Sequence, residues 1–136
     1  MFSYIINKFK KEEGQAIVEF ALILPILIMI LCGIIDFGWY FTNQNIIDNC
    51  SRVGARYMSV DPEATEEAVT TKINDMAPSN IKDLEIIVSP PNGPVAIGDV
   101  KVEVKGYVTP LTPFVSLFFV DGKMPLDSSC TMRVEQ

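Results

Sequence analysis

Histidine is absent from the 136 residues of the chain. This side chain is the one used most often as a general base near neutral pH, and it is the usual activator of a serine or cysteine nucleophile. Carboxylates and lysines could still carry out acid–base chemistry, but no spacing among them indicates a catalytic site. We therefore expect a protein that is not an enzyme.

Cysteine and basic residues are also scarce. The cysteines are Cys32, Cys50 and Cys130, and because no Cys-x-x-Cys spacing occurs, a structural zinc site has no ligand set. No metal and no cofactor is expected. The chain has 11 Lys and Arg against 17 Asp and Glu, a net charge of −6, so no basic face is available for nucleic acid and we expect no nucleic-acid partner.

What the chain does contain is an apolar run near its N-terminus. The residues between Glu19 and Asp36 carry no charge, and counted from Gln15 the run reaches the roughly 20 residues that a membrane helix needs. Lys8, Lys10 and Lys11 precede it and favour an N-terminus on the cytoplasmic side. We therefore predict three parts, listed by residue number: a cytoplasmic leader (1–14), a transmembrane helix (15–38) and an extracytoplasmic α+β domain (39–136). Trp39 and Tyr40 follow the run, where an interfacial aromatic belt would lie.

The apolar run also has other interpretations. A secretory signal peptide needs small residues at its cleavage site, and a lipoprotein signal needs one before its cysteine, but the run ends in Leu31-Cys32-Gly33. A buried core helix is disfavoured by the lysine flank. An ordinary signal anchor that is never cleaved remains an open alternative.

A glycine and a glutamate mark the start of the run. Gly14 lies between the polar leader and the apolar helix, and Glu19 lies five residues further on. A carboxylate at membrane depth costs about 2.5–3.5 kcal/mol and is usually functional. The simpler alternative is that Glu19 marks the start of the membrane segment and reaches the interface.

The segment Gly14-Gln-Ala-Ile-Val-Glu19-Phe20 resembles the processing site of type IV-like prepilins. With the segments listed next, the chain resembles the TadE-like family, the minor pilins or pseudopilins of tight-adherence (Flp) pilus systems. These further segments are Leu22–Leu27, Gly33–Gly38, Cys50–Arg56 and Thr131–Glu135. The resemblance covers residues 11–60 well and little of the remainder.

The resemblance implies a pilin-like mechanism. A prepilin peptidase would cut between Gly14 and Gln15 and remove the leader. The carboxylate of Glu19 would then pair with the new N-terminal amine of Gln15 in a neighbouring subunit, which suits a charge in low dielectric. Pro25 is carried over as a family feature and should kink the helix, because it removes a backbone hydrogen bond.

The resemblance also implies partners and a location. The expected partners are the prepilin peptidase, other pilin and pseudopilin subunits, the pilus assembly machinery and membrane lipid. The expected location is the cytoplasmic membrane of a prokaryote, with a single pass, the C-terminus outside and incorporation into a cell-surface pilus as a further step. Adhesion, secretion and DNA uptake all stay open as downstream roles. The alternative is an uncleaved single-pass protein that presents a small extracytoplasmic binding domain.

Periodicity predicts an α+β domain with one long helix, one short helix and a small antiparallel sheet. The first helix should continue to about Val60 and bury one stripe, formed by Ile46, Cys50, Val53 and Tyr57. Asp61 as N-cap and Pro62 at the first helical position predict a second helix that runs to about Met76 and stops before Pro78.

The C-terminal half alternates with period two, which predicts three half-buried strands. The inward sets are Leu84, Ile86 and Val88; then Val100, Val102, Val104 and Val108; then Cys130, Met132 and Val134. Turn residues at 90–94 separate the first two strands. The economical arrangement is a three-stranded antiparallel sheet covered by the long helix.

Two features leave alternatives open. The apolar stretch 110–120 is expected to fill the core, with an exposed patch for a partner or membrane as the alternative. Cys50 and Cys130 both point inward in this scheme, so they could form a disulfide worth about 2–4 kcal/mol. Two buried free thiols are the alternative.

Overall fold

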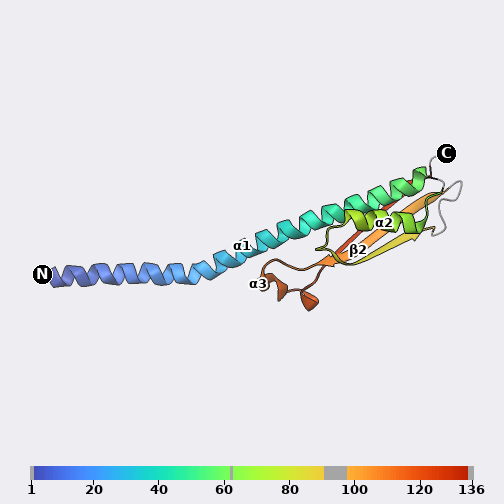
Figure 1. The fold of residues 1–136 in the computed structure, drawn as a ribbon. Helices are drawn as coiled ribbons and strands as arrows, with labels where there is room; N and C mark the ends of the chain where they lie inside the picture. The colour runs from blue at the N-terminus through green and yellow to red at the C-terminus, as the bar shows by residue number, and fades with distance from the viewer. Residues whose placement is uncertain (1, 62, 91–97, 135–136) are drawn as a thin grey trace.

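A long helix carries a small α+β domain at its C-terminal end (Figure 1). The computed structural model describes residues 2–61, 63–90 and 98–134. Its helices are α1 (Phe2–Val60), α2 (Glu66–Met76) and the short α3 (Pro113–Ser116), followed by the 3-10 turn η1 (Val120–Gly122). The N-terminal half of α1 projects away from the domain as a stalk (Figure 1).

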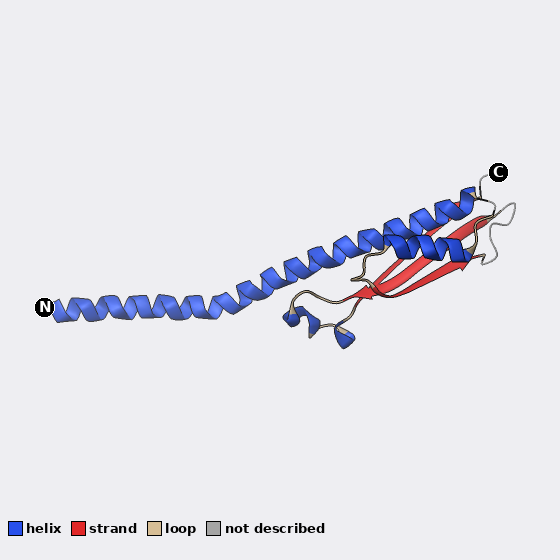
Figure 2. Ribbon diagram, viewed as in Figure 1, coloured by secondary structure: helices blue, strands red, loops and turns tan. Residues whose placement is uncertain are grey.

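The sheet has three antiparallel strands in the order β1-β2-β3. They are β1 (Lys82–Ser89), β2 (Asp99–Val108) and β3 (Met124–Arg133). In the central strand, Val102 lies opposite Val88 of β1 and Cys130 of β3. Both α1 and α2 cover one face of this sheet (Figure 2). The predicted α+β fold, with a long helix, a short helix and a three-stranded antiparallel sheet, is confirmed.

The core lies between the sheet and the two helices. Val100, Val102, Val104 and Val108 are all buried, as their alternation predicts. Gly54 of α1 faces Ile73 and Val69 of α2 and Val102 of β2, and a Cβ at this position would meet their methyl groups at 3.0, 3.2 and 3.1 Å. The missing side chain therefore lets two helices and the sheet meet at one point.

The predicted stripe on α1 is only partly right. Cys50 is buried, but Ile46, Val53 and Tyr57 are half-buried. The side chains that are buried on this helix are Asp36, Asn43, Ile47, Cys50, Ser51, Ala55, Met58 and Ser59. Polar residues are among them because they form hydrogen bonds inside the domain, so hydropathy alone misplaced the stripe.

The predicted start of the second helix is wrong. The N-cap of α2 is Thr65, whose hydroxyl accepts a hydrogen bond from the N–H of Ala68 at 3.3 Å. The predicted cap Asp61 instead accepts from the N–H of Glu63 at 3.0 Å and closes a turn before the helix. Pro62 lies outside the described residues. The end of the helix at Met76 agrees with the prediction.

Strand alternation is confirmed along the described parts of all three strands, although β3 begins earlier than predicted. Met124 and Leu126 are buried at its start and were not among the predicted core residues. Of the predicted turn at 90–94, residues 91–94 lie outside the described residues.

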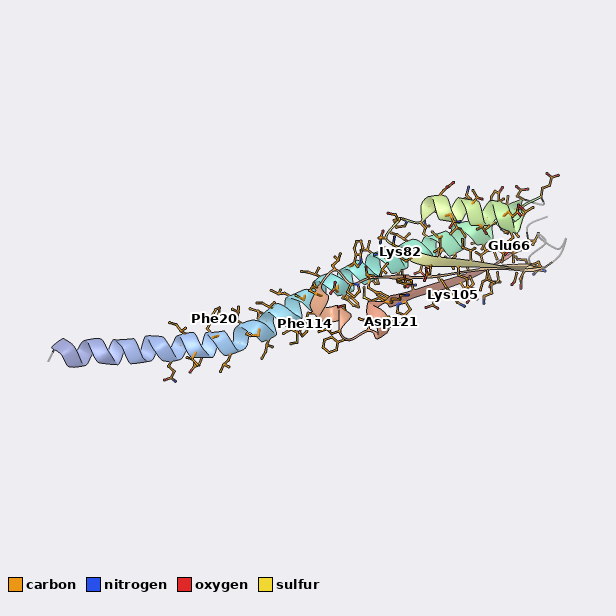
Figure 3. The ribbon with its side chains drawn as sticks, turned by 60° about the horizontal axis from the view of Figure 1, so that its bottom comes forward. Phe20, Glu66, Lys82, Lys105, Phe114 and Asp121 are labelled. Carbon is orange, nitrogen blue, oxygen red and sulfur yellow. The ribbon has the colours of Figure 1, made fainter. Side chains whose placement is uncertain are left out.

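The apolar stretch 110–120 is not core, so the expectation that it fills the interior is wrong. Leu117 and Phe118 are 80% and 74% exposed. This stretch, which contains α3, projects from the domain beside α1 rather than lying beneath the sheet (Figures 1 and 3). The alternative of an exposed patch therefore holds.

Candidate functional site

The predicted processing residues lie on the exposed stalk of α1. Gly14, Gln15 and Glu19 are all exposed, and a Cβ at Gly14 would meet nothing within 4 Å. The side-chain amide of Gln15 donates a hydrogen bond to Oε1 of Glu19 at 3.2 Å. The structure thus brings Gln15 and Glu19 together within one chain, while their pairing between two subunits stays a prediction.

The stalk is apolar, and no other described part of the chain buries it. Its most apolar part is long enough to cross a membrane, and none of that part is buried inside the protein. Side chains such as Phe20 project outward from the helix (Figure 3). Water does not solvate such a surface favourably. This single long apolar helix of the described chain therefore indicates a single-pass membrane protein.

Pro25 lies inside α1. The ribbon changes direction in the light-blue part of the helix (Figure 1). A proline inside a helix removes a hydrogen bond and clashes with the preceding turn. Our attribution of this bend to Pro25 stays a prediction.

Asp36 joins the C-terminal end of the apolar run to a segment far along the chain. Asp36 is only 1% exposed. Oδ1 accepts hydrogen bonds from the N–H of Leu111 at 2.7 Å and of Thr112 at 3.2 Å, and Oδ2 accepts from the Thr112 hydroxyl. A buried carboxylate needs such donors, because its desolvation is otherwise costly. Asp36 therefore fixes residues 111–112 against α1.

Trp39 holds the same segment one turn further on. Its indole N–H donates to the backbone oxygen of Thr109 at 3.2 Å. The indole N–H of this predicted belt residue therefore bonds to the protein's own backbone, although Trp39 is only half-buried. The sequence analysis did not predict that Asp36 binds residues 111–112. The one signal available in the sequence was a carboxylate directly after an apolar run.

A family model described as "TadE-like protein" matches residues 14–56. Residues 14–56 are a TadE-like segment. The predicted resemblance to this family is therefore confirmed over this range. No curated protein and no solved structure matches the chain.

The TadE-like segment begins at Gly14 and contains Glu19, Pro25 and Asp36. It ends inside the part of α1 that packs on the sheet. The match thus covers both the exposed stalk and the helix that the domain is built on.

Cys50, within the TadE-like segment, and Cys130 of β3 are both free thiols in the structure. Cys50 is fully buried in the core, and Cys130 is half-buried and packs against that core. Desolvation raises the pKa of the Cys50 thiol. Their disulfide stays a prediction.

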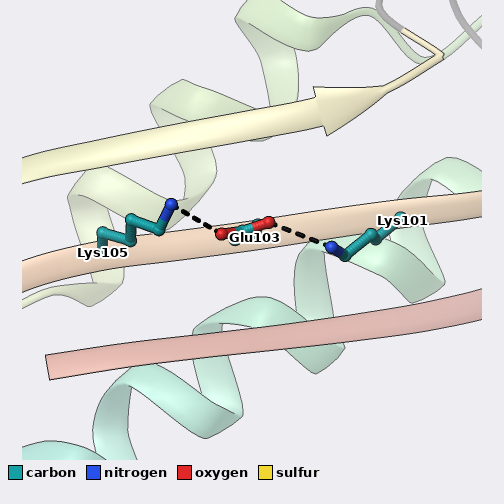
Figure 4. Close-up of polar contacts among 3 residues, drawn as sticks. All are labelled: Lys101, Glu103 and Lys105. Carbon is teal, nitrogen blue, oxygen red and sulfur yellow. Dashed lines mark hydrogen bonds and ion pairs between the residues drawn. The ribbon is translucent and has the colours of Figure 1, made fainter.

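The outer face of the sheet, away from the TadE-like segment, carries a row of charges on β2 (Figure 4). Glu103 forms ion pairs with Lys105 at 2.7 Å and Lys101 at 3.0 Å. Hydrogen bonds from these lysines, that of Lys105 first, lower the pKa of Glu103. Exposed pairs of this kind contribute little to stability and indicate a solvated face. Across the described residues, no group of three His, Cys, Asp or Glu side chains could hold a metal ion.

Proposed function

We propose that the protein is a TadE-like minor pilin or pseudopilin that acts in the assembly of a surface Tad (Flp) pilus after cleavage behind Gly14. The observation that carries this proposal is the position of Gly14 and Glu19. Both lie on an exposed apolar helix that continues without a break into a folded domain, inside a segment that matches the family.

Gly14 suits a cleavage site inside a helix. A Cβ at this position would meet nothing within 4 Å, so no described side chain blocks an enzyme's approach on this side of the helix. Glycine also weakens a helix by about 1 kcal/mol relative to alanine, which eases the local unwinding that a peptidase needs to reach a peptide bond. The three lysines of the leader would hold this end on the cytoplasmic side until the cut is made.

Cleavage would create the partner that Glu19 lacks. Among the residues whose side chains the structure describes, the carboxylate pairs only with the neutral amide of Gln15, at 3.2 Å. A new N-terminal ammonium on Gln15 would carry a positive charge, so its hydrogen bond to the carboxylate would gain a direct charge–charge attraction that the neutral amide does not provide. In the low dielectric of a membrane, this difference favours pairing of Glu19 with the amine of an adjacent subunit. The partners follow: a prepilin peptidase, other pilin or pseudopilin subunits, the assembly machinery and lipid.

The N-terminus of the membrane-extracted protein from its native host tests the proposal. Intact mass and terminal peptide sequencing should find a chain that starts at Gln15. Gly14→Ile should abolish the cut, whereas Gly33→Ile, at another glycine whose Cβ would meet nothing within 4 Å, should leave it intact. A native start at Met1 would instead establish an uncut anchor that presents a binding domain, and a start beyond Ile35 would show that the run is a disposable signal.

A further inference from the structure

The segment Leu111–Phe119 is apolar and exposed at the end of the domain nearest the stalk. No charged residue occurs between Lys105 and Asp121. The exposed apolar side chains of the segment are Leu111, Phe114, Leu117, Phe118 and Phe119. The rings of Phe114 and Phe118 lie 5.7 Å apart, so the aromatic side chains form one continuous surface.

The level of this segment along α1 is fixed by its contacts. Val115 and Phe119 line a groove of about 420 Å³ together with Gly33 and Phe37 of α1. Gly33 belongs to the apolar run, ahead of Asp36. Phe114 lies along α1 between Phe20 and the sheet (Figure 3). The segment therefore turns back beside the outer end of the membrane helix, and whatever surrounds Gly33 and Phe37 also reaches it.

The backbone of the segment is prepared for an apolar environment. Asp36 accepts from the N–H groups of Leu111 and Thr112. The N–H groups of residues 117–119 donate to backbone oxygens within the segment: Leu117 to Phe114, Phe118 to Val115 and Phe119 to Ser116. The hydroxyl of Ser116 donates to the Pro113 oxygen at 2.6 Å. Backbone that faces hydrocarbon must satisfy its polar groups internally, because lipid tails offer no hydrogen bonds.

We propose that residues 111–119 dip into the outer leaflet of the bilayer and form a second, monotopic lipid contact beside the membrane helix. Bilayer lipid is the occupant because the segment lies level with residues 33–37 of the helix that spans it. The exposed side chains of Ile34 and Phe37 continue the same apolar surface on α1. Interfacial segments bind lipid through buried apolar area of this kind. With two attachment points, the domain would be held at a fixed angle to the membrane.

This inference rests on the proposed function, in which α1 is inserted in a membrane. The test therefore measures lipid contact both at the membrane helix and at residues 111–119. A diazirine-bearing amino acid is placed, one site at a time, at Leu117, at Ile26 in the stalk and at Val60 at the far end of α1. Val60 is the matched control, because it is also apolar and exposed but lies at the opposite end of the domain. The full chain is reconstituted in phosphatidylethanolamine–phosphatidylglycerol vesicles, irradiated and analysed by mass spectrometry.

Phospholipid adducts are expected at positions 26 and 117. Burial of one such side chain in an apolar phase favours the buried state roughly ten-fold or more, so position 117 should exceed position 60 by about this factor. Adducts from 117 to a second copy of the chain, or no adduct from 117 while 26 labels lipid, would overturn the inference and leave the proposed function standing. Failure of position 26 to label lipid would overturn both.

Discussion

The carboxylate of Asp36 accepts hydrogen bonds from both the backbone N–H and the hydroxyl of Thr112, which lies 76 residues further along the chain. One residue at the end of the apolar run thereby sets the position of the exposed apolar segment. Trp39 reinforces the connection through Thr109. The stalk and the domain are thus linked by side-chain contacts as well as by the continuous helix.

Removal of this carboxylate should loosen the segment. Asp36→Ala leaves the N–H groups of Leu111 and Thr112 without their acceptor, and an unsatisfied buried group costs about 1–3 kcal/mol. Asp36→Asn should cost less, because its amide oxygen still accepts. Thermal unfolding of the detergent-solubilised full chain should therefore rank the proteins as wild type, Asp36→Asn, Asp36→Ala in falling stability, and hydrogen exchange at residues 111–119 should rise in the same order.

Asp48→Ala is the control for this series. Asp48 lies on the same helix, is half-buried and accepts one hydrogen bond from the Gln44 side chain at 3.2 Å. Its loss should leave exchange at residues 111–119 unchanged. Equal exchange in Asp36→Ala and wild type would show that the segment is held by other contacts.

Gly54 should not tolerate a larger residue. The Cβ of Gly54→Ala would lie 3.0–3.2 Å from methyl groups on α2 and β2, which is closer than ordinary van der Waals contact. Overpacking of a tight core costs about 1–3 kcal/mol, and Gly54→Val should cost more than Gly54→Ala. Chemical denaturation should show both losses of stability.

Gly38→Ala is the matched substitution on the same helix. Nothing lies within 4 Å of its Cβ, so the gain of helix propensity should stabilise the protein by up to about 1 kcal/mol. A neutral Gly54→Ala would mean that α2 moves away without cost.

The sheet could be predicted from the sequence because one face of each strand meets the core and the other meets water. Val100, Val102 and Val104 alternate with Lys101 and Glu103, and this pattern alone gives the strand and its inner face. The membrane segment and its TadE-like start could also be predicted from the sequence. The length of an apolar run and the spacing of a glycine and a glutamate are local features of the chain.

Features that depend on contacts between distant residues could not be predicted. The N-cap of α2 is Thr65 and not the predicted Asp61, because the side chain of Asp61 closes a turn with Glu63 instead of capping the helix. The segment around Leu117 was expected in the core because composition records that a stretch is apolar, not what surrounds it. The structure places Leu117 outside the core and bonds Leu111 and Thr112 to Asp36, a pairing that no local pattern contains.

Cys50 and Cys130 can be distinguished by alkylation. Burial raises the pKa of Cys50, so little thiolate is present at neutral pH, and the thiol is also fully covered. When the folded protein is treated briefly with iodoacetamide in the absence of reductant, Cys50 should stay unlabelled while half-buried Cys130 reacts slowly. Denaturation without reductant should then expose Cys50 to labelling. A peptide that links Cys50 to Cys130 before reduction would contradict the free-thiol state and establish the predicted disulfide.

Glu19 should matter for assembly rather than for cleavage. Glu19→Gln keeps the size of the side chain and removes the charge that would pair with the amine of a neighbouring Gln15. We therefore expect normal processing, seen as a start at Gln15 by mass spectrometry, together with a strong loss of surface pili by electron microscopy of the native host. The charge carries the effect because a carboxylate in a low dielectric gains far more from an ammonium than an amide does.

Glu67→Gln on α2 is the control for this experiment. Glu67 is also an exposed helical glutamate, but it lies in the domain and far from the apolar run, so both cleavage and piliation should be normal. A Glu19→Asp variant retains the charge on a shorter side chain and should recover part of the lost piliation. Normal piliation by Glu19→Gln would contradict the pairing mechanism. Loss of cleavage in the same variant would show that the peptidase, and not the neighbouring subunit, recognises Glu19.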